Sequence, residues 1–131
     1  MIAGTPRIDD YAWFAVIVRA DYPSSTTTMD NNNQYISFFS LSYGLLSHSY
    51  QECTSYCAPH QEISLANYSM DGEWHRIRVS VKNDLMTTYV DDVLRLNSRD
   101  SRLVKGRPGF SFSCCTGLTY YFDNILVVSL D

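Results

Sequence analysis

The sequence predicts an all-β protein, a two-sheet antiparallel β-sandwich of the jelly-roll type. Short runs with a period of two recur at a spacing of roughly 8 to 12 residues, turn residues separate them, and no convincing amphipathic helix is present. An eight-stranded open barrel is the structural alternative. At 131 residues the chain is expected to form one domain, residues 1–131.

The clearest pair of strands lies in residues 71–93. Apolar side chains alternate there with Arg, Ser and Lys, so one side of the first strand is expected to face the core. Asn and Asp pairs follow at the spacing of tight turns. In order, the pattern predicts a strand over 75–82, a turn at Asn83-Asp84, a strand over 85–90, a turn at Asp91-Asp92 and a return at Val93-Leu94.

The other strands are expected on both sides of this pair. Residues 11–20 are apolar on both alternating faces as far as Arg19, as in a central strand covered on each side. A helix would tolerate that pattern, but the β-branched and aromatic content favours a strand. Residues 21–33, rich in Ser, Thr and Asn, predict a loop. Further strands are expected at 34–41, 45–52, 63–68 and 110–115, with 96–109 as a polar connection and 118–130 as the closing segment.

Alternation also assigns faces within these strands. In residues 34–41 it places Tyr35 and Phe39 on one face and Ile36 and Phe38 on the other. Trp74 is expected to pack in the core.

Composition and charge restrict the partners. A net charge of -4 argues against nucleic acid, and no apolar run approaches the roughly 20 residues that span a bilayer. No signal peptide is visible, so the sequence is expected to be cytoplasmic, a mature form or an excised domain. The even number of cysteines favours an oxidising compartment, extracellular or at the cell surface. They allow three disulfide pairings among Cys53, Cys57, Cys114 and Cys115.

Five segments in order give the chain a family resemblance. They are F-A-V-I-V-R-A from Phe14, E-W-H-R-I-R-V-S-V-K-N from Glu73, T-Y-V-D-D-V from Thr88, G-R-P-G-F-S-F from Gly106 and Y-F-D-N-I-L-V from Tyr121. With them the chain resembles the concanavalin A-like lectin/glucanase superfamily, especially its laminin-G-like jelly rolls. Members commonly carry strands before the position of Phe14, which this chain is expected to lack. The resemblance therefore implies an exposed strand edge at which a neighbouring chain, a neighbouring domain or a second copy could pair.

The resemblance implies a choice among lectins, carbohydrate-binding modules, glucanases and adhesion domains. Hydrolysis needs two carboxylates across the scissile bond, and the E-x-D-x-x-E motif of the glucanases is absent, since Glu52, Glu62 and Glu73 stand apart. We therefore expect a non-catalytic, lectin-like carbohydrate-binding domain. A self-associating structural or adhesive protein is the alternative, and a polysaccharide-active enzyme comes third.

Candidate ligand-binding residues follow from the chemistry of sugars. Aromatic rings can cover the apolar face of a sugar, and arginines offer several donors to acidic or polyhydroxylated ones. The structural alternatives are a solvated sheet face and a protein interface. The candidates are Trp13, Arg19, Tyr43, Tyr50, Arg76 and Arg78.

A structural Ca²⁺ is the expected cofactor. Asp123-Asn124 resembles the Asp-Asn or Asp-Asp pair on the last strand of several carbohydrate-binding jelly rolls, and Asp9, Asp10 or Asp21 could add carboxylate ligands. The three histidines match no compact metal motif and are expected to be structural, with His75 on the apolar face of its strand. They are His48, His60 and His75.

Overall fold

The computed structural model describes residues 2–4, 13–20, 33–40, 44–52, 61–68, 72–103, 105–112 and 120–129. Every regular element in these ranges is a β-strand, and they contain no helix long and apolar enough to cross a membrane. The strands are β1 (Ile2–Gly4), β2 (Trp13–Ala20), β3 (Gln34–Ser40), β4 (Leu45–Gln51), β5 (Gln61–Asn67), β6 (Ile77–Lys82), β7 (Leu85–Val90), β8 (Val93–Arg99), β9 (Arg107–Phe112) and β10 (Tyr120–Phe122).

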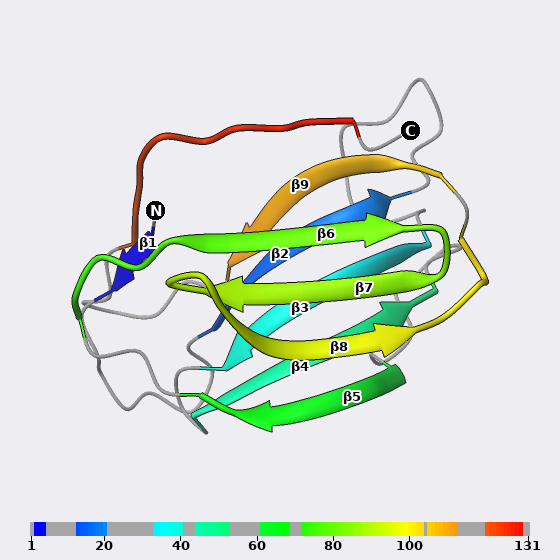
Figure 1. The fold of residues 1–131 in the computed structure, drawn as a ribbon, viewed down its shortest axis with the longest axis horizontal. Helices are drawn as coiled ribbons and strands as arrows, with labels where there is room; N and C mark the ends of the chain where they lie inside the picture. The colour runs from blue at the N-terminus through cyan, green and yellow to red at the C-terminus, as the bar shows by residue number, and fades with distance from the viewer. Residues whose placement is uncertain are drawn as a thin grey trace.

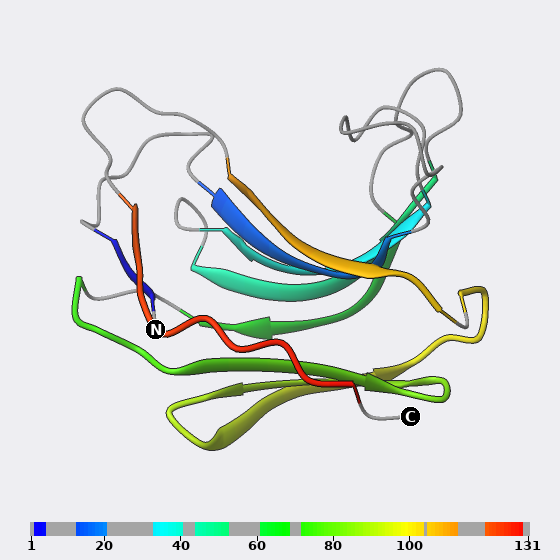
Figure 2. The same ribbon diagram turned by 90° about the horizontal axis from the view of Figure 1, so that it is seen from above.

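These strands form two stacked antiparallel sheets and a short ribbon. The larger sheet has five strands in the order β5-β4-β3-β2-β9, the smaller has three in the order β6-β7-β8, and β1 pairs with β10. The sheets lie one above the other (Figures 1 and 2), with β8 packed on β4 and β5 and β6 packed on β2. The described strands are thus the two-sheet sandwich that the sequence predicts.

The core lies between the two sheets. Phe14 of β2 stacks on Phe39 of β3 with ring centroids 4.5 Å apart, and both rings are about 1% exposed. Each buried side chain of this size stabilises the fold by roughly 1.5–3 kcal/mol relative to an exposed one. The alternation predicted for β3 is confirmed, because Tyr35 and Phe39 belong to the inter-sheet clusters and Ile36 does not. The buried members of these clusters are Phe14, Tyr35, Phe39, Leu46, Tyr50, Met86, Val90 and Leu96.

Both predicted hairpin turns are confirmed. Asn83 has a φ of 55° at the turn between β6 and β7, a left-handed conformation that asparagine tolerates. Asp91 and Asp92 have φ values of 51° and 64°, so the turn between β7 and β8 has positive φ at both central residues, as a type I′ hairpin requires. These turns fix the register of the three-stranded sheet.

Two expectations about the second half of the chain were wrong. Residues 96–109 were expected to be a polar connection, but β8 continues to Arg99 and β9 begins at Arg107. This strand looks polar because Ser98, on its inner side, bonds to a histidine instead of packing as an apolar residue. Trp74, expected in the core, is 49% exposed, since it precedes β6 and lies beside Tyr121 at the edge of the sandwich.

A close backbone contact joins the ends of β2 and β9. The register of these strands shifts between Ile17 and Ala20, and Arg19 there has a φ of 52°. Gly106 lies against this bulge, and a Cβ atom on it would come within 2.3 Å of the Arg19 carbonyl carbon. Only glycine fits at this position without displacing backbone.

We therefore expect Gly106→Ala to lower the free energy of unfolding by about 1 to 2 kcal/mol, because overpacking forces a backbone shift. Urea unfolding of the variant measures the loss. Ser111→Ala, farther along β9, is the control for a change to alanine in this strand, and equal stability of the two variants would contradict the close contact.

Candidate functional site

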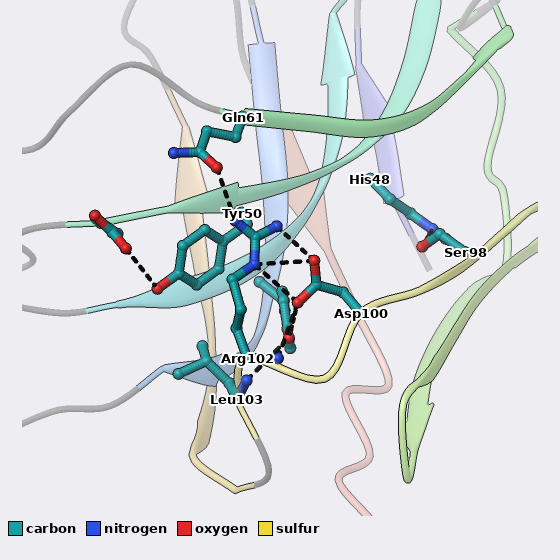
Figure 3. A network of polar contacts seen from close by, with 9 residues as sticks. His48, Tyr50, Gln61, Ser98, Asp100, Arg102 and Leu103 are labelled. Carbon is teal, nitrogen blue, oxygen red and sulfur yellow. Dashed lines mark hydrogen bonds and ion pairs between the residues drawn. The ribbon is translucent and has the colours of Figure 1, made fainter.

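A polar cluster ties the segment after β8 to the five-stranded sheet (Figure 3). The Tyr35 hydroxyl donates to the Asp100 carboxylate at 2.5 Å, and the Leu103 backbone N–H donates to the same hydroxyl at 2.9 Å. Arg102 Nε donates to both Asp100 oxygens at 2.9 Å, and its guanidinium lies 3.8 Å from the centre of the Tyr50 ring. The Arg102 side chain also donates to Gln61 Oε1 at 2.7 Å.

The charges of this cluster shift its pKa values in opposite directions. Hydrogen bonds from Arg102, and then from Tyr35, lower the pKa of Asp100 to about 2. Burial, and then the hydrogen bond to Asp100, raise the pKa of Tyr35 to about 12. At neutral pH the carboxylate is therefore ionised and the phenol is protonated, which is the pairing that the hydrogen bonds need.

His48 lies deeper between the sheets and is fully buried. Its Nδ1 bonds to Ser98 Oγ at 2.7 Å, its Nε2 bonds to Thr88 Oγ1 at 2.8 Å, and Thr88 bonds onward to Ser37 at 2.8 Å. Burial lowers the pKa of His48 to about 4, so the ring is neutral at physiological pH. The structure gives this histidine a structural place, as the sequence predicts.

The space beside this cluster is too small for a sugar. A recess lined by Tyr35, Ser98 and Asp100, among others, holds about 10 Å³, which is room for at most one water molecule. The cluster therefore holds the two sheets together, and only the outside of the sandwich offers surfaces large enough for a sugar.

One outer surface is the distal face, the side of the five-stranded sheet that faces away from the three-stranded sheet. Trp13 lies there against Phe38, with ring centroids 5.1 Å apart. The middle of this face is closed, because Ile17 and Ile36 are only 1% and 2% exposed. At one end the buried Gln34 donates from Nε2 to Gln51 at 2.8 Å, while its Oε1 has no hydrogen-bond partner among the described residues.

The other outer surface is the exposed side of the three-stranded sheet. Cross-strand registers set three rows of side chains side by side on it, and we call these nine residues the polar platform. From adjacent-strand and residue spacings it measures about 10 Å by about 14 Å. Its members are Arg78, Tyr89 and Leu94 in one row, Ser80, Thr87 and Asn97 in the second, and Lys82, Leu85 and Arg99 in the third.

The platform is cationic and ordered by its own contacts. The Arg78 guanidinium lies 4.3 Å from the centre of the Tyr89 ring, a cation–π contact that orients its donors. Ser80 and Thr87 hydroxyls bond to one another at 2.6 Å, and Arg99 pairs with Asp84 at the rim at 2.6 Å. Three of the nine side chains are cationic and none is acidic.

The predicted ligand-binding residues are not brought together at one place. Trp13 lies on the distal face, whereas Arg76 and Arg78 lie on the opposite side of the sandwich, where Arg76 pairs with Asp92 at 3.6 Å. Tyr50 is 3% exposed, so its ring offers no open face to a sugar. Tyr43 lies outside the described residues.

Arg19 serves as a connection between elements. Its guanidinium donates to the Asn83 carbonyl oxygen in the β6–β7 turn and to the Leu103 carbonyl oxygen at 2.9 Å. It therefore holds the turn and the segment after β8 against the end of β2, and these bonds occupy donors that the sequence assigned to a ligand.

The described residues supply few ligands for the expected calcium ion. Asp123 Oδ1 accepts the Asn124 backbone N–H at 2.8 Å, both side chains are exposed, and Asn124 has a φ of 53°. Within the described ranges no three His, Cys, Asp or Glu side chains gather as a metal site would need. Asp9, Asp10, Asp21, His60 and the cysteines lie outside those ranges, so calcium and the disulfides stay predictions.

Comparison with known proteins bears on the fold. No family model and no curated protein matches the chain. A solved structure, the carbohydrate-binding module CBM66 from Bacillus subtilis, matches with a TM-score of 0.51 and 13% sequence identity. The match covers 82% of this chain and 68% of that chain. This likeness shows the fold.

Sequence reasoning found part of the platform and missed the rest. Arg78 was a candidate because it alternates with apolar residues along one strand and so lies on the solvent-facing side. Thr87 and Asn97 were not, because only the register of β7 and β8 sets them beside Ser80. Alternation with the buried Met86 and Thr88 on β7 is the signal that could have placed Thr87 outside.

Proposed function

We propose that the protein is a non-catalytic carbohydrate-binding domain, extracellular or at the cell surface, that binds an anionic polysaccharide on the polar platform. The observation that carries the proposal is one sheet face that presents three cations, three hydroxyls and an amide, with no acid among its nine residues; of the cations, Arg99 is paired with Asp84 at the rim. These groups offer donors to sugar hydroxyls and charge to a carboxylate or sulfate.

The contrast with the whole chain supports an anionic ligand. The net charge is -4, yet the platform is positive, so an anionic polymer is repelled by much of the surface and attracted here. Arg78 is the main anchor, since its guanidinium is already oriented on Tyr89 and loses little freedom on binding. The fold shared with a carbohydrate-binding module supports carbohydrate over other anions.

The acidic residues support a non-catalytic role. Asp84, Asp91 and Asp100 are paired with Arg99, His75 and Arg102, respectively. The pKa of Asp100 is lowered, whereas a general acid for glycoside hydrolysis needs a raised one. Polymer length should therefore stay unchanged on incubation with the protein.

Calorimetric titration tests the platform with a polyuronate, a sulfated galactan and a neutral glucan. We expect the anionic polymers to bind more tightly than the neutral one, and the affinity to fall with added salt. Arg78→Gln combined with Lys82→Gln should weaken anionic binding about 10-fold or more, because each lost charged contact costs roughly 1.5–3 kcal/mol.

The matched control is Lys105→Gln with Arg107→Gln, which removes the same charge from exposed residues of and before β9. It should leave the affinity nearly unchanged. Equal losses in the two double variants would mean that only net charge matters, and loss in Trp13→Ala alone would move the site to the distal face. Either result would contradict carbohydrate binding on the polar platform.

A further inference from the structure

The inter-sheet core is open on one side of the sandwich. Five strands cannot be covered by three, and the three-stranded sheet ends at β6, which packs on β2. Phe110 of β9 is paired with Val16 on the side of the sheet that carries Phe14, yet it is 44% exposed. Its ring contacts Phe122 at 5.5 Å between centroids.

The edge of β6 is free among the described residues. β6 pairs with β7 alone, and the alternation of antiparallel hydrogen bonds leaves the backbone N–H and C=O groups of Ile77, Val79 and Val81 directed outward. The side chains of these three residues point into the core clusters. The strand has no inward charge, proline or bulge to protect this edge, and its protecting features are the outward charges of Arg78 and Lys82.

Exposed apolar side chains line the same side of the molecule. The C-terminal segment 123–129 runs on the β6 and β9 side of the sandwich (Figure 1), at the level of the three-stranded sheet (Figure 2). No ladder joins it to β6 within the described residues. The rings of Trp74 and Tyr121 lie at one end of this side, with their centroids 6.4 Å apart. The exposed apolar residues of the C-terminal segment are Ile125, Leu126, Val127 and Val128, which are 59%, 82%, 65% and 63% exposed.

We propose that an extended segment of another protein adds to the sandwich as a strand beside β6, between β6 and residues 123–129. Main-chain hydrogen bonds to Ile77, Val79 and Val81 supply the pairing, and the inward side chains of the added strand cover Phe110. Four consecutive exposed apolar side chains beside an unpaired strand are typical of an interaction site.

Charge selects the partner. The outward side of β6 carries Arg78 and Lys82 and no acid, while Arg76 before the strand is paired with Asp92. An added strand therefore needs apolar residues on its inner side and acidic residues on its outer side, in strict alternation. A second copy fits poorly, because pairing β6 with itself about Ser80 sets Arg78 opposite Lys82, and pairing about Val79 sets Arg76 opposite Lys82.

Synthetic peptides test the proposal without any polysaccharide, so its failure is distinct from failure of the carbohydrate site. The probes are a Val-Glu alternating peptide, a Val-Lys alternating peptide and a peptide with the Val-Glu composition in two blocks. We expect the Val-Glu peptide to bind about 10-fold more tightly than either other peptide and to raise the melting temperature. The emission of Trp74 should shift to the blue, and Trp74→Phe should lose that shift while keeping the calorimetric signal.

Two further experiments distinguish strand addition at β6 from nonspecific electrostatic attraction. N-methylation of the peptide groups that face β6 should abolish binding, with the protein itself unchanged. Arg78→Glu with Lys82→Glu should reverse the preference towards the Val-Lys peptide. Binding that survives N-methylation, equal affinity for the block peptide, or a concentration-dependent dimer that excludes the peptides would each overturn the proposal.

Discussion

Acidification from pH 7 to pH 4 is expected to lower the free energy of unfolding by about 3 kcal/mol through His48 alone. The pKa of this ring is about 4 in the folded protein and about 6.5 when it is unfolded, because burial disfavours the charged form. Between these two values the unfolded chain binds a proton that the folded chain does not. Stability is therefore complete above pH 6.5 and lost as the pH falls towards 4.

Hydrogen bonding does not offset this loss. When the His48 ring is protonated, the Ser98 and Thr88 hydroxyls can both accept hydrogen bonds from it. When the ring is neutral, one hydroxyl accepts and the other donates, so both forms of His48 keep their partners. What changes on protonation is the cost of a charge that is fully buried. The prediction thus isolates burial as the cause.

Urea unfolding at a series of pH values measures the effect, and NMR of the imidazole carbon gives the His48 pKa directly. His48→Gln should be less stable at pH 7 and should lack the slope between pH 6.5 and pH 4. His75→Gln is the matched control, because His75 is bonded to Asp91 at 2.6 Å in another part of the sandwich. A slope that persists unchanged in His48→Gln would contradict the assignment.

Much of the fold could be predicted, because strands and turns depend on residues that are close together in the sequence. Alternation over residues 34–40 assigns the faces of β3, and the Asp91-Asp92 pair marks a turn whose φ values demand such residues. The end of β8 could not be predicted in this way. Its inner side carries Ser98, whose burial depends on His48 from a strand 50 residues away in the sequence.

The candidate site was less predictable, because it depends on where the smaller sheet ends. Tyr50 is buried since Arg102 and the segment after β8 cover its ring, while Trp74 is exposed since no described strand extends the three-stranded sheet past β6. Neither fact is present in the local sequence. Long side chains at strand ends, such as Arg19, likewise choose partners from elements that only the fold brings near.

Removal of the Asp100 charge is expected to cost about 2 to 3 kcal/mol of unfolding free energy at pH 5 and above. Its carboxylate accepts from the Tyr35 hydroxyl, from Arg102 Nε and from the Arg102 backbone N–H, and its side chain is 17% exposed. A pKa lowered from 3.8 to about 2 corresponds to about 2 kcal/mol, and hydrogen bonds to a neutral amide oxygen are weaker than those to a carboxylate.

The stability that Asp100 contributes depends on pH. A carboxylate whose folded pKa is lowered contributes stability that is complete above 3.8 and lost as the pH falls through about 2. The stability curves of the wild type and Asp100→Asn should therefore converge as the pH falls to about 2, below the pH range in which His48 acts. Asp84→Asn is the control, because its pair with Arg99 is 42% and 66% exposed and should contribute less than about 1 kcal/mol.

The titration of the Tyr35 phenol at alkaline pH also detects removal of the Asp100 charge. Its pKa of about 12 has burial as the larger cause and the hydrogen bond to Asp100 as the second, so Asp100→Asn should lower it without returning it to 10. Ultraviolet difference titration of the phenol measures this shift, and Asp84→Asn should leave it unchanged. Tyr35 could instead titrate identically in both variants while stability falls only in Asp100→Asn. The Asp100 carboxylate would then stabilise the fold through its pair with Arg102 and not through its hydrogen bond with Tyr35.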